Sequence, residues 1–369
     1  MRLPRVVFTV LLLFSIAAFG QNARIVIPAG SPEDNELTAI AAEPDASKRM
    51  AAYEDFIQKY SSNKAAAAYA EWQLSQLCLA AGDKNNALNW GDKALQDYPN
   101  DLDLIVADTN VAMAMKDNAK TVEYAVKGAA VYHSIAQQTK PADVSDDAWK
   151  RRIADEQGSA KSSYDFLETA AYNAIVAEKD PNQRMDFIEA YTPAFPKSQF
   201  DQQVSQLAML SLQQLNQPQR LEAYGEKALA ADPDSIPTLL MLAGTYAGNP
   251  KQSAKAVEYA EKVLKLVGPN PTDNTAKSYA GLAHTSLGRA DLNLGKVSSA
   301  TTEFRTAVSL LKDDPPDQQA ALYYLGYAAG KENRRAESIA ALEKAAAING
   351  PYQGPAKELL ARIQSAGKK

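Results

Sequence analysis

Residues 287–308 read LGRADLNLGKVSSATTEFRTAV, and this stretch decides the fold. Its second half places Ala300, Phe304 and Ala307 in steps of four and three, which puts all three on one face of a helix. The two alanines let a neighbouring helix come close, and Phe304 fills the space between them. Gly295 stands where the preceding helix must end and the chain must turn. The stretch therefore predicts two helices joined by a turn and packed closely together.

This pattern resembles one tetratricopeptide repeat, a helix–turn–helix unit of 34 residues. The position near the end of the second helix recurs along the chain at Ala94, Gly128, Ala228, Val263, Ala307 and Ala345. Steps longer than 34 residues coincide with proline or glycine, and insertions in loops leave helix packing undisturbed. Alternating strand patterns are absent. The resemblance covers roughly residues 35–365 and implies an all-α fold, a right-handed superhelical solenoid of such helix pairs.

The first twenty residues have the three parts of a secretory signal peptide. Two arginines lie within residues 1–5, a mostly apolar segment follows over 6–19, and Ala18 and Gly20 are small residues before a cut ahead of Gln21. A membrane-spanning helix needs roughly 20 apolar residues. We therefore expect a cleaved signal and an exported, periplasmic or secreted protein without a stable membrane anchor. An uncleaved anchor is the alternative.

The remaining sequence divides at loops and changes of pattern. Gly158 either kinks one long helix or separates two. Arg49 recurs as Arg184, 135 residues later, and neighbouring residues recur at the same offset, which favours an old duplication of a four-repeat block. The expected segments are a signal peptide (1–20), a flexible lead-in (21–34), N-terminal repeats (35–140), a long helix or helix pair with a connecting repeat (141–199), C-terminal repeats (200–351), and a capping helix with its tail (352–369).

Charge and composition exclude several classes of function. The formal net charge is -5. Without the first twenty residues, which hold two arginines, 37 basic and 44 acidic residues remain, so the charge becomes -7. A mildly acidic surface argues against nucleic acid as the main partner. Cys78 is the one cysteine, so neither an intramolecular disulfide nor a cysteine metal cluster is expected.

Catalytic and cofactor motifs are missing from the sequence. There is no G-x-S-x-G elbow, no H-E-x-x-H and no phosphate-binding loop, and His133 and His284 are too far apart for a local metal pair. We therefore predict a protein that is not an enzyme and holds neither cofactor nor metal. An enzyme whose residues follow no recognisable pattern remains the alternative.

The resemblance implies that first helices line a concave groove, where side chains are not needed for packing. Amide, hydroxyl and aromatic groups there suit a protein or peptide partner. A glycan or cell-envelope polymer is the alternative, because Trp72, Tyr323 and Tyr327 could stack on sugar rings. Tyr323 and Tyr327 are also open to a second reading, in which the next repeat covers both rings. The candidate groove residues are Tyr69, Trp72, Gln76, Asn110, Gln206, Gln213, Thr245, Asn249, Arg289, Asn293, Tyr323, Tyr327 and Lys331.

Overall fold

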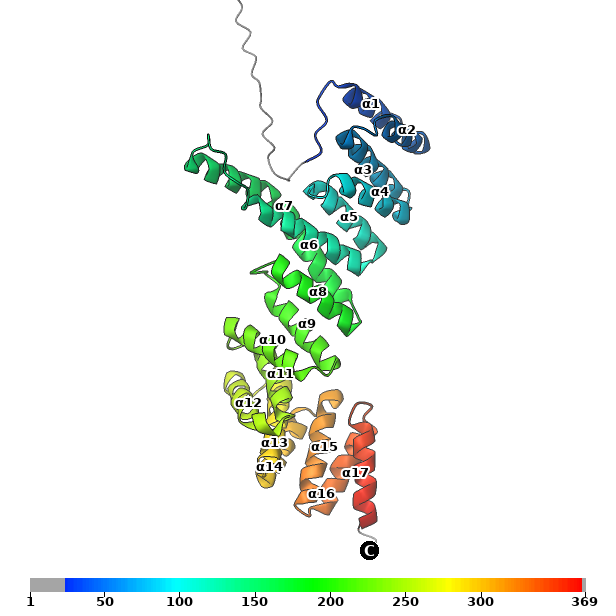
Figure 1. Cartoon of the computed structure of the whole chain (residues 1–369). Helices are drawn as coiled ribbons and strands as arrows, with labels where there is room; N and C mark the ends of the chain where they lie inside the picture. The colour runs from blue at the N-terminus through cyan, green and yellow to red at the C-terminus, as the bar shows by residue number, and fades with distance from the viewer. Residues whose placement is uncertain (1–23, 367–369) are drawn as a thin grey trace, which may run out of the picture. The chain divides into compact units, whose positions relative to one another are not determined.

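All regular structure in residues 24–366, the part of the chain that the computed structural model describes, is helical (Figure 1). This part contains 17 α-helices and one short 3-10 helix, and no strand. Consecutive helices pack against each other. The predicted all-α solenoid of helix pairs is thereby confirmed, and its right-handed twist stays a prediction. The predicted signal peptide lies outside the described residues.

The chain forms two compact units, and the division passes through one helix. Residues 180–185 belong to the second unit and residues 186–198 to the first, so the division falls within α8 (Pro181–Ala194). The first unit contains α1 (Pro32–Ala41), α2 (Ala46–Lys59), α3 (Lys64–Ala80), α4 (Lys84–Asp97), α5 (Leu102–Met115), α6 (Asn118–Ile135) and α7 (Asp146–Ala177).

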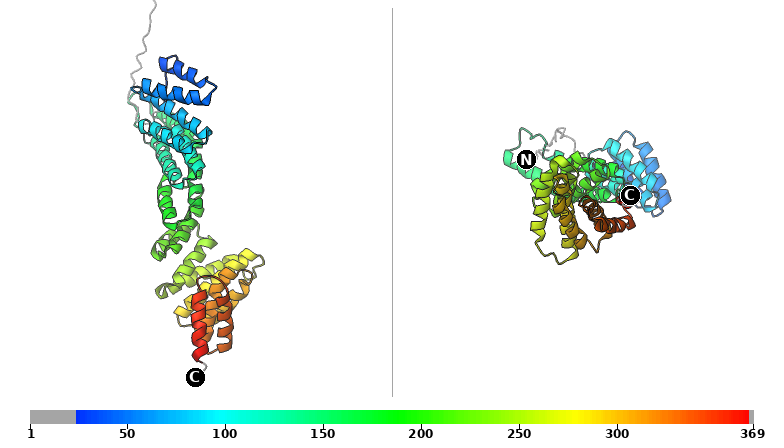
Figure 2. Two further views of the ribbon diagram at one scale, coloured as in Figure 1. Left: turned by 90° about the vertical axis from the view of Figure 1, so that its right-hand side faces the viewer. Right: turned by 90° about the horizontal axis from the view of Figure 1, so that it is seen from below.

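The second unit is a series of helix pairs that ends in a single helix (Figure 2). Its elements are α9 (Asp201–Gln214), α10 (Pro218–Ala231), α11 (Ile236–Ala247), η1 (Pro250–Gln252), α12 (Ser253–Val267), α13 (Asn274–Asn293), α14 (Val297–Leu310), α15 (Pro315–Lys331), α16 (Arg335–Ala347) and α17 (Gln353–Ala366).

Each unit has a first layer, made of the odd-numbered helices. In the second unit α9 packs on α11, α11 on α13, α13 on α15, and α15 on α17. In the first unit α3 packs on α5, and α5 on α7. Within each unit, each even-numbered helix other than α8 lies between two odd ones in sequence and packs on both of them. Side chains of the first layer that do not point at an even helix are therefore free to face a common surface.

The stretch that decides the fold is the pair α13 and α14. Ala300, Phe304 and Ala307 are all 0% exposed, and Gly295 has a left-handed φ of 77° in the turn, as the sequence predicts. A Cβ atom at Gly288 would lie 2.6 Å from Cε1 of Phe304. The pair α15 and α16 repeats the arrangement, since a Cβ at Gly326 would lie 2.5 Å from Cγ of Leu342. A glycine on the first helix of each pair thus accepts a large side chain from the second.

One helix start differs from the expected segments. Helix α1 begins at Pro32, within the expected flexible lead-in of residues 21–34. Ser31 accepts a hydrogen bond from the amide of Asp34, and proline is favoured in the first turn of a helix, so residues 31–34 form a helix start. Helix α7 runs unbroken through Gly158, which settles the choice in favour of one long helix.

The local structure agrees with the proposed duplication. Helices α2 and α8 both begin after an aspartate whose carboxylate accepts amide hydrogen bonds in the first turn, Asp45 in one and Asp180 in the other. Aromatic pairs also recur at an offset of 135. The ring centres lie 4.5 Å apart in Phe56–Tyr60 and 4.8 Å apart in Tyr191–Phe195. Each pair follows its helix start by the same number of residues.

Candidate functional site

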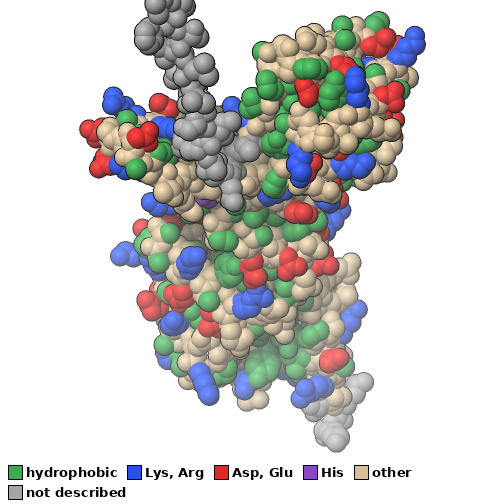
Figure 3. Space-filling model, turned by 45° about the horizontal axis from the view of Figure 1, so that its top comes forward, with side chains coloured by type: hydrophobic (Ala, Val, Ile, Leu, Met, Phe, Trp, Pro, Cys, Tyr) green, Lys and Arg blue, Asp and Glu red, His purple; other side chains and the backbone are tan. Residues whose placement is uncertain are grey.

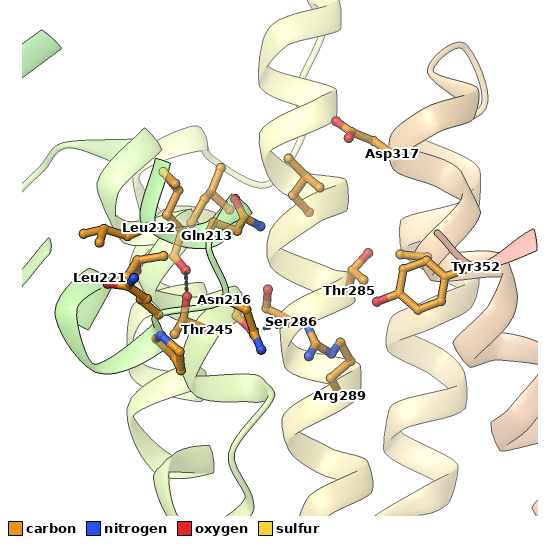
Figure 4. Close-up of a pocket in the computed structure, with 17 residues that line it drawn as sticks. Leu212, Gln213, Asn216, Leu221, Thr245, Thr285, Ser286, Arg289, Asp317 and Tyr352 are labelled. Atoms are coloured by element: carbon orange, nitrogen blue, oxygen red, sulfur yellow. Dashed lines mark hydrogen bonds between the residues drawn. The ribbon is translucent and has the colours of Figure 1, made fainter. Parts of the chain in front are cut away.

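A hollow of about 610 Å³ opens on the first layer of the second unit (Figure 4). Its walls come from α9, the following turn and the first residues of α10, from α11, α13 and α15, and from the loop before α17. It therefore lies on the surface where the resemblance placed the partner-binding groove.

The floor of the hollow is apolar. Leu212 of α9, Leu240 and Met241 of α11, and Leu282 of α13 line it. These side chains belong to helices whose other apolar residues form the core, so the floor is a continuation of the packed interior. It would release water on binding an aliphatic or aromatic group.

Hydroxyl and amide groups surround this floor. The hydroxyls of Thr245 and Thr285 each donate to a backbone carbonyl one turn earlier in the same helix, at 2.8 Å. Their oxygens can still accept a hydrogen bond from an occupant. Ser286 and the exposed amide of Gln213 add two further polar groups. The combination of an apolar floor and a few convergent polar groups is typical of a binding site.

Arg289 is the only arginine or lysine that lines the hollow. Its Nη1 donates to the carbonyl of Gly244 at 3.2 Å, near the carboxyl end of α11, and its Cζ lies 5.3 Å from the ring centre of Tyr324. Within the described part of the chain, no carboxylate lies within ion-pair distance of this guanidinium. An arginine has five N–H donors, and this bond uses one of them. Arg289 is therefore suited to bind an anionic group.

Asp317 is the one acidic residue of the lining, and Figure 4 shows it at the opposite end from Arg289. Burial raises the pKa of its carboxyl above the ordinary value, and the charge of Asp314 raises it further. The hollow thus has a cation at one end and, at the other end, a carboxyl group that ionises less readily than an ordinary aspartate.

The structure brings three of the thirteen candidate groove residues together at the hollow. These are Gln213, Thr245 and Arg289. Asn293 instead donates its amide to the carbonyl of Ala247 at 3.0 Å and so caps the end of α11.

The remaining candidates in the second unit lie outside the hollow. Asn249 caps η1 by accepting a hydrogen bond from the amide of Lys251. Gln206 is half-buried on α9. Tyr327 is 37% exposed, and the Lys331 ammonium lies 5.2 Å from its ring centre.

Tyr323 and Tyr327 do not share one environment. The ring centre of Tyr323 lies 5.2 Å from that of Tyr352, and the side chain packs against the cluster of α15, α16 and α17. Tyr323 is thus half-buried, whereas Tyr327 is exposed.

The first unit holds four of the candidates. The ring of Tyr69 meets that of Trp72 edge-on at 5.9 Å, and Asn110 is exposed on α5. The indole Nε1 of Trp72 and the amide Nε2 of Gln76 are buried without a hydrogen-bond partner in the described chain. The Trp72 side chain as a whole is half-buried.

A second hollow, of about 590 Å³, lies in the first unit among α2, α3 and α4. Its wall includes Trp90, and the Lys93 ammonium lies 3.8 Å from the centre of that ring. Burial raises the pKa of Glu71 to about 7, against the opposing effect of Lys93. Lys93, from the same helix, thus already makes a cation–π contact with the Trp90 ring.

Sequence reasoning missed Thr285, Ser286, Asp317 and Tyr352. Thr285 and Ser286 lie four and three residues before Arg289, which places them on the same side of the helix. Helical spacing counted back from Arg289 would therefore have identified them. Tyr352 belongs to a loop after Pro351, where no periodicity indicates the direction of a side chain.

Within residues 24–366, no group of three or more histidine, cysteine, aspartate or glutamate side chains is arranged to hold a metal ion. None of the helices in that range has the length and apolar character to cross a membrane. The face in Figure 3 carries interspersed acidic and basic side chains.

Comparison with known proteins adds little to these observations. No protein-family model matches the chain, and no curated protein matches it. Among solved structures, the crystal structure of the TPR domain of P58(IPK) is similar over 91% of this chain and 97% of that chain, with 13% sequence identity and a TM-score of 0.31. A TM-score this low carries no argument. The helix pairs themselves define the class, an all-α helical-repeat protein.

Proposed function

We propose that the protein is a non-enzymatic scaffold of tetratricopeptide type and that the hollow of its second unit binds an extended segment of a partner protein. The observation that carries this proposal is Arg289, a half-buried arginine that has no counter-ion among residues 24–366 and lies beside an apolar floor. A segment with an aliphatic or aromatic side chain next to an anionic group would satisfy both features. The anion would pair with the guanidinium, and the side chain would cover the floor.

Binding to an array of synthetic octapeptides tests this proposal. Peptides with an acidic residue beside a large apolar one should bind, and Arg289→Gln should weaken the best of them at least tenfold, equivalent to about 1.4 kcal/mol. Glutamine removes the charge but keeps a polar side chain. Titration calorimetry measures the effect.

Lys331→Gln is the matched control, because it removes an exposed cation of the first layer that does not line the hollow. Its affinity should equal that of the parent protein. Equal binding by Arg289→Gln and the parent would refute the anchoring role, and an array without any bound peptide would refute the peptide-binding function.

The same proposal includes export, which rests on the sequence of residues 1–20. The intact mass of protein purified from its native source should correspond to a chain that begins at Gln21. Recovery of a chain that begins at Met1 from the membrane fraction would contradict it and support the uncleaved anchor.

A further inference from the structure

The loop between α16 and α17 brings Tyr352 to the wall of the hollow. Figure 4 shows the phenol ring extending from this loop towards Thr285 and Arg289 on α13. The ring centre lies 5.2 Å from that of Tyr323 and 5.6 Å from that of Tyr324. Since the Arg289 guanidinium lies over Tyr324, the tyrosines form one aromatic wall beside the candidate anion site.

Gln319 of α15 holds this loop. The side chain is 1% exposed, and its Nε2 donates to the carbonyls of Ala345 at 3.2 Å and Ile348 at 2.5 Å. Its Oε1 accepts from the amide of Tyr352 at 3.3 Å. Both ends of the amide are thus occupied by the backbone of residues 345–352. A buried amide used in this way fixes the loop, because moving the loop would leave buried polar groups unpaired.

The fit between Gln319 and the loop is close. A Cβ atom at Gly350 would lie 2.3 Å from Oε1 of Gln319, so even alanine there requires a displacement. Gly350 does not have a left-handed φ, and the backbone itself would accept alanine. A substitution at this position therefore perturbs the loop without touching any residue that lines the hollow.

Tyr352 also has a defined chemical state. Burial, and after it a hydrogen bond to Tyr324, raises the pKa of the phenol above its usual value. The hydroxyl therefore stays protonated and neutral at physiological pH, so that it does not repel an anion at Arg289.

We infer that Tyr352 sets the size of the group that the hollow accepts beside the anion, and that Gln319 is the positioning residue that holds Tyr352 in place. This inference rests on the proposed function and deepens it. The acidic group has two neighbours in the occupant: the large apolar one covers the floor, and the one on the other side would have to fit between the phenol ring and α13. A small residue would pass, and an aromatic one would meet Tyr352.

Two octapeptide probes test the inference. They derive from the best binder on the array and keep its large apolar residue on one side of the acid. They differ only at the residue on the other side of the acid, which is glycine in one probe and phenylalanine in the other. The parent protein should prefer the glycine probe. Tyr352→Ala should shift the affinity ratio towards phenylalanine by about tenfold, in the range that one side-chain group contributes in a pocket. Tyr352→Phe should keep the parental ratio.

Gly350→Ala and Gln319→Leu should shift the ratio in the same direction as Tyr352→Ala, because both release the loop. Gly354→Ala is the matched control, since a Cβ there meets nothing within 4 Å. Circular dichroism verifies that each variant is folded. If Gly350→Ala changes the affinity ratio no more than Gly354→Ala does, while Arg289→Gln still loses binding, the inference is overturned and the proposed function stands. Absence of binding to either probe by the parent protein overturns both.

Discussion

Replacing Phe304 with alanine should lower the free energy of unfolding of the second unit by about 3–5 kcal/mol, the usual cost of truncating a buried aromatic residue. The side chain is 0% exposed, and its ring stacks on Tyr324 with a centroid distance of 5.6 Å. It also fills the space that Gly288 leaves open. Truncation would empty this space between three helices. Urea denaturation followed by circular dichroism measures the loss.

Leu294→Ala is the control for this experiment. Leu294 lies in the turn between α13 and α14 and is 47% exposed, so its replacement should change stability by no more than about 0.5 kcal/mol. A Phe304 variant as stable as the Leu294 variant would show that the predicted packing face does not form in solution.

Replacing Asp108 with asparagine should instead stabilise the first unit at neutral pH. Asp108 is 1% exposed on α5, and its Oδ2 has no hydrogen-bond partner in the described chain. A Cβ at Gly91 would lie 1.8 Å from its Oδ1, so the carboxyl group packs directly against the backbone of α4. Burial raises the pKa of Asp108 to about 8, and the negative charge of Asp92 adds to the effect.

The sign of the pH dependence follows from this raised pKa. The unfolded chain loses the proton near the ordinary value of 3.8, whereas the folded chain keeps it to about pH 8. Stability therefore falls as pH rises from about 4 to 8. The two lysines that oppose the shift are Lys120 and Lys127, and they do not cancel it. Asparagine cannot ionise, so at pH 7 the variant should be more stable by roughly 2–4 kcal/mol, with little difference at pH 4.

Tryptophan fluorescence during urea unfolding measures this difference, because Trp72, Trp90 and Trp149, the three tryptophans of the chain, all belong to the first unit. Asp103→Asn is the control on the same helix, since the Asp103 side chain is 55% exposed and its partner Arg24 is 4.0 Å away. A parental pH slope in Asp108→Asn would show that Asp108 is already ionised in the folded protein.

The sequence was sufficient for the fold because the packing signal is local. Ala300, Phe304 and Ala307 lie within two turns of one helix, and Gly295 marks the turn before it. Periodicity of this kind determines which face is buried without reference to distant residues. Ser31 and Pro32 also indicate the start of α1 by their local chemistry. The start was missed because that segment has no amphipathic pattern.

The site was only partly predictable, because it is assembled from separate repeats. The phase of the helices placed Gln213, Thr245 and Arg289 on one surface. It could not show that Asn293 donates a hydrogen bond to a carbonyl at the end of α11. Nor could it show that Tyr323 is half-buried while Tyr327 is exposed, because burial depends on the neighbouring helices. Tyr352 enters from a loop whose path is fixed by Gln319, 33 residues earlier in the chain. Contacts of this kind are visible only in three dimensions.

The pairing of a glycine on one helix with a large residue on the next bears on how such a chain evolves. Gly288 and Phe304 fit each other in volume, and so do Gly326 and Leu342. A larger residue at 288 would be accepted only if the residue at 304 became smaller, so substitutions at the two positions depend on each other. The two helices of a pair are consequently expected to change together during evolution. New repeats would arise by copying whole pairs, and surface residues such as Gln213 and Arg289 could then diverge without disturbing that fit.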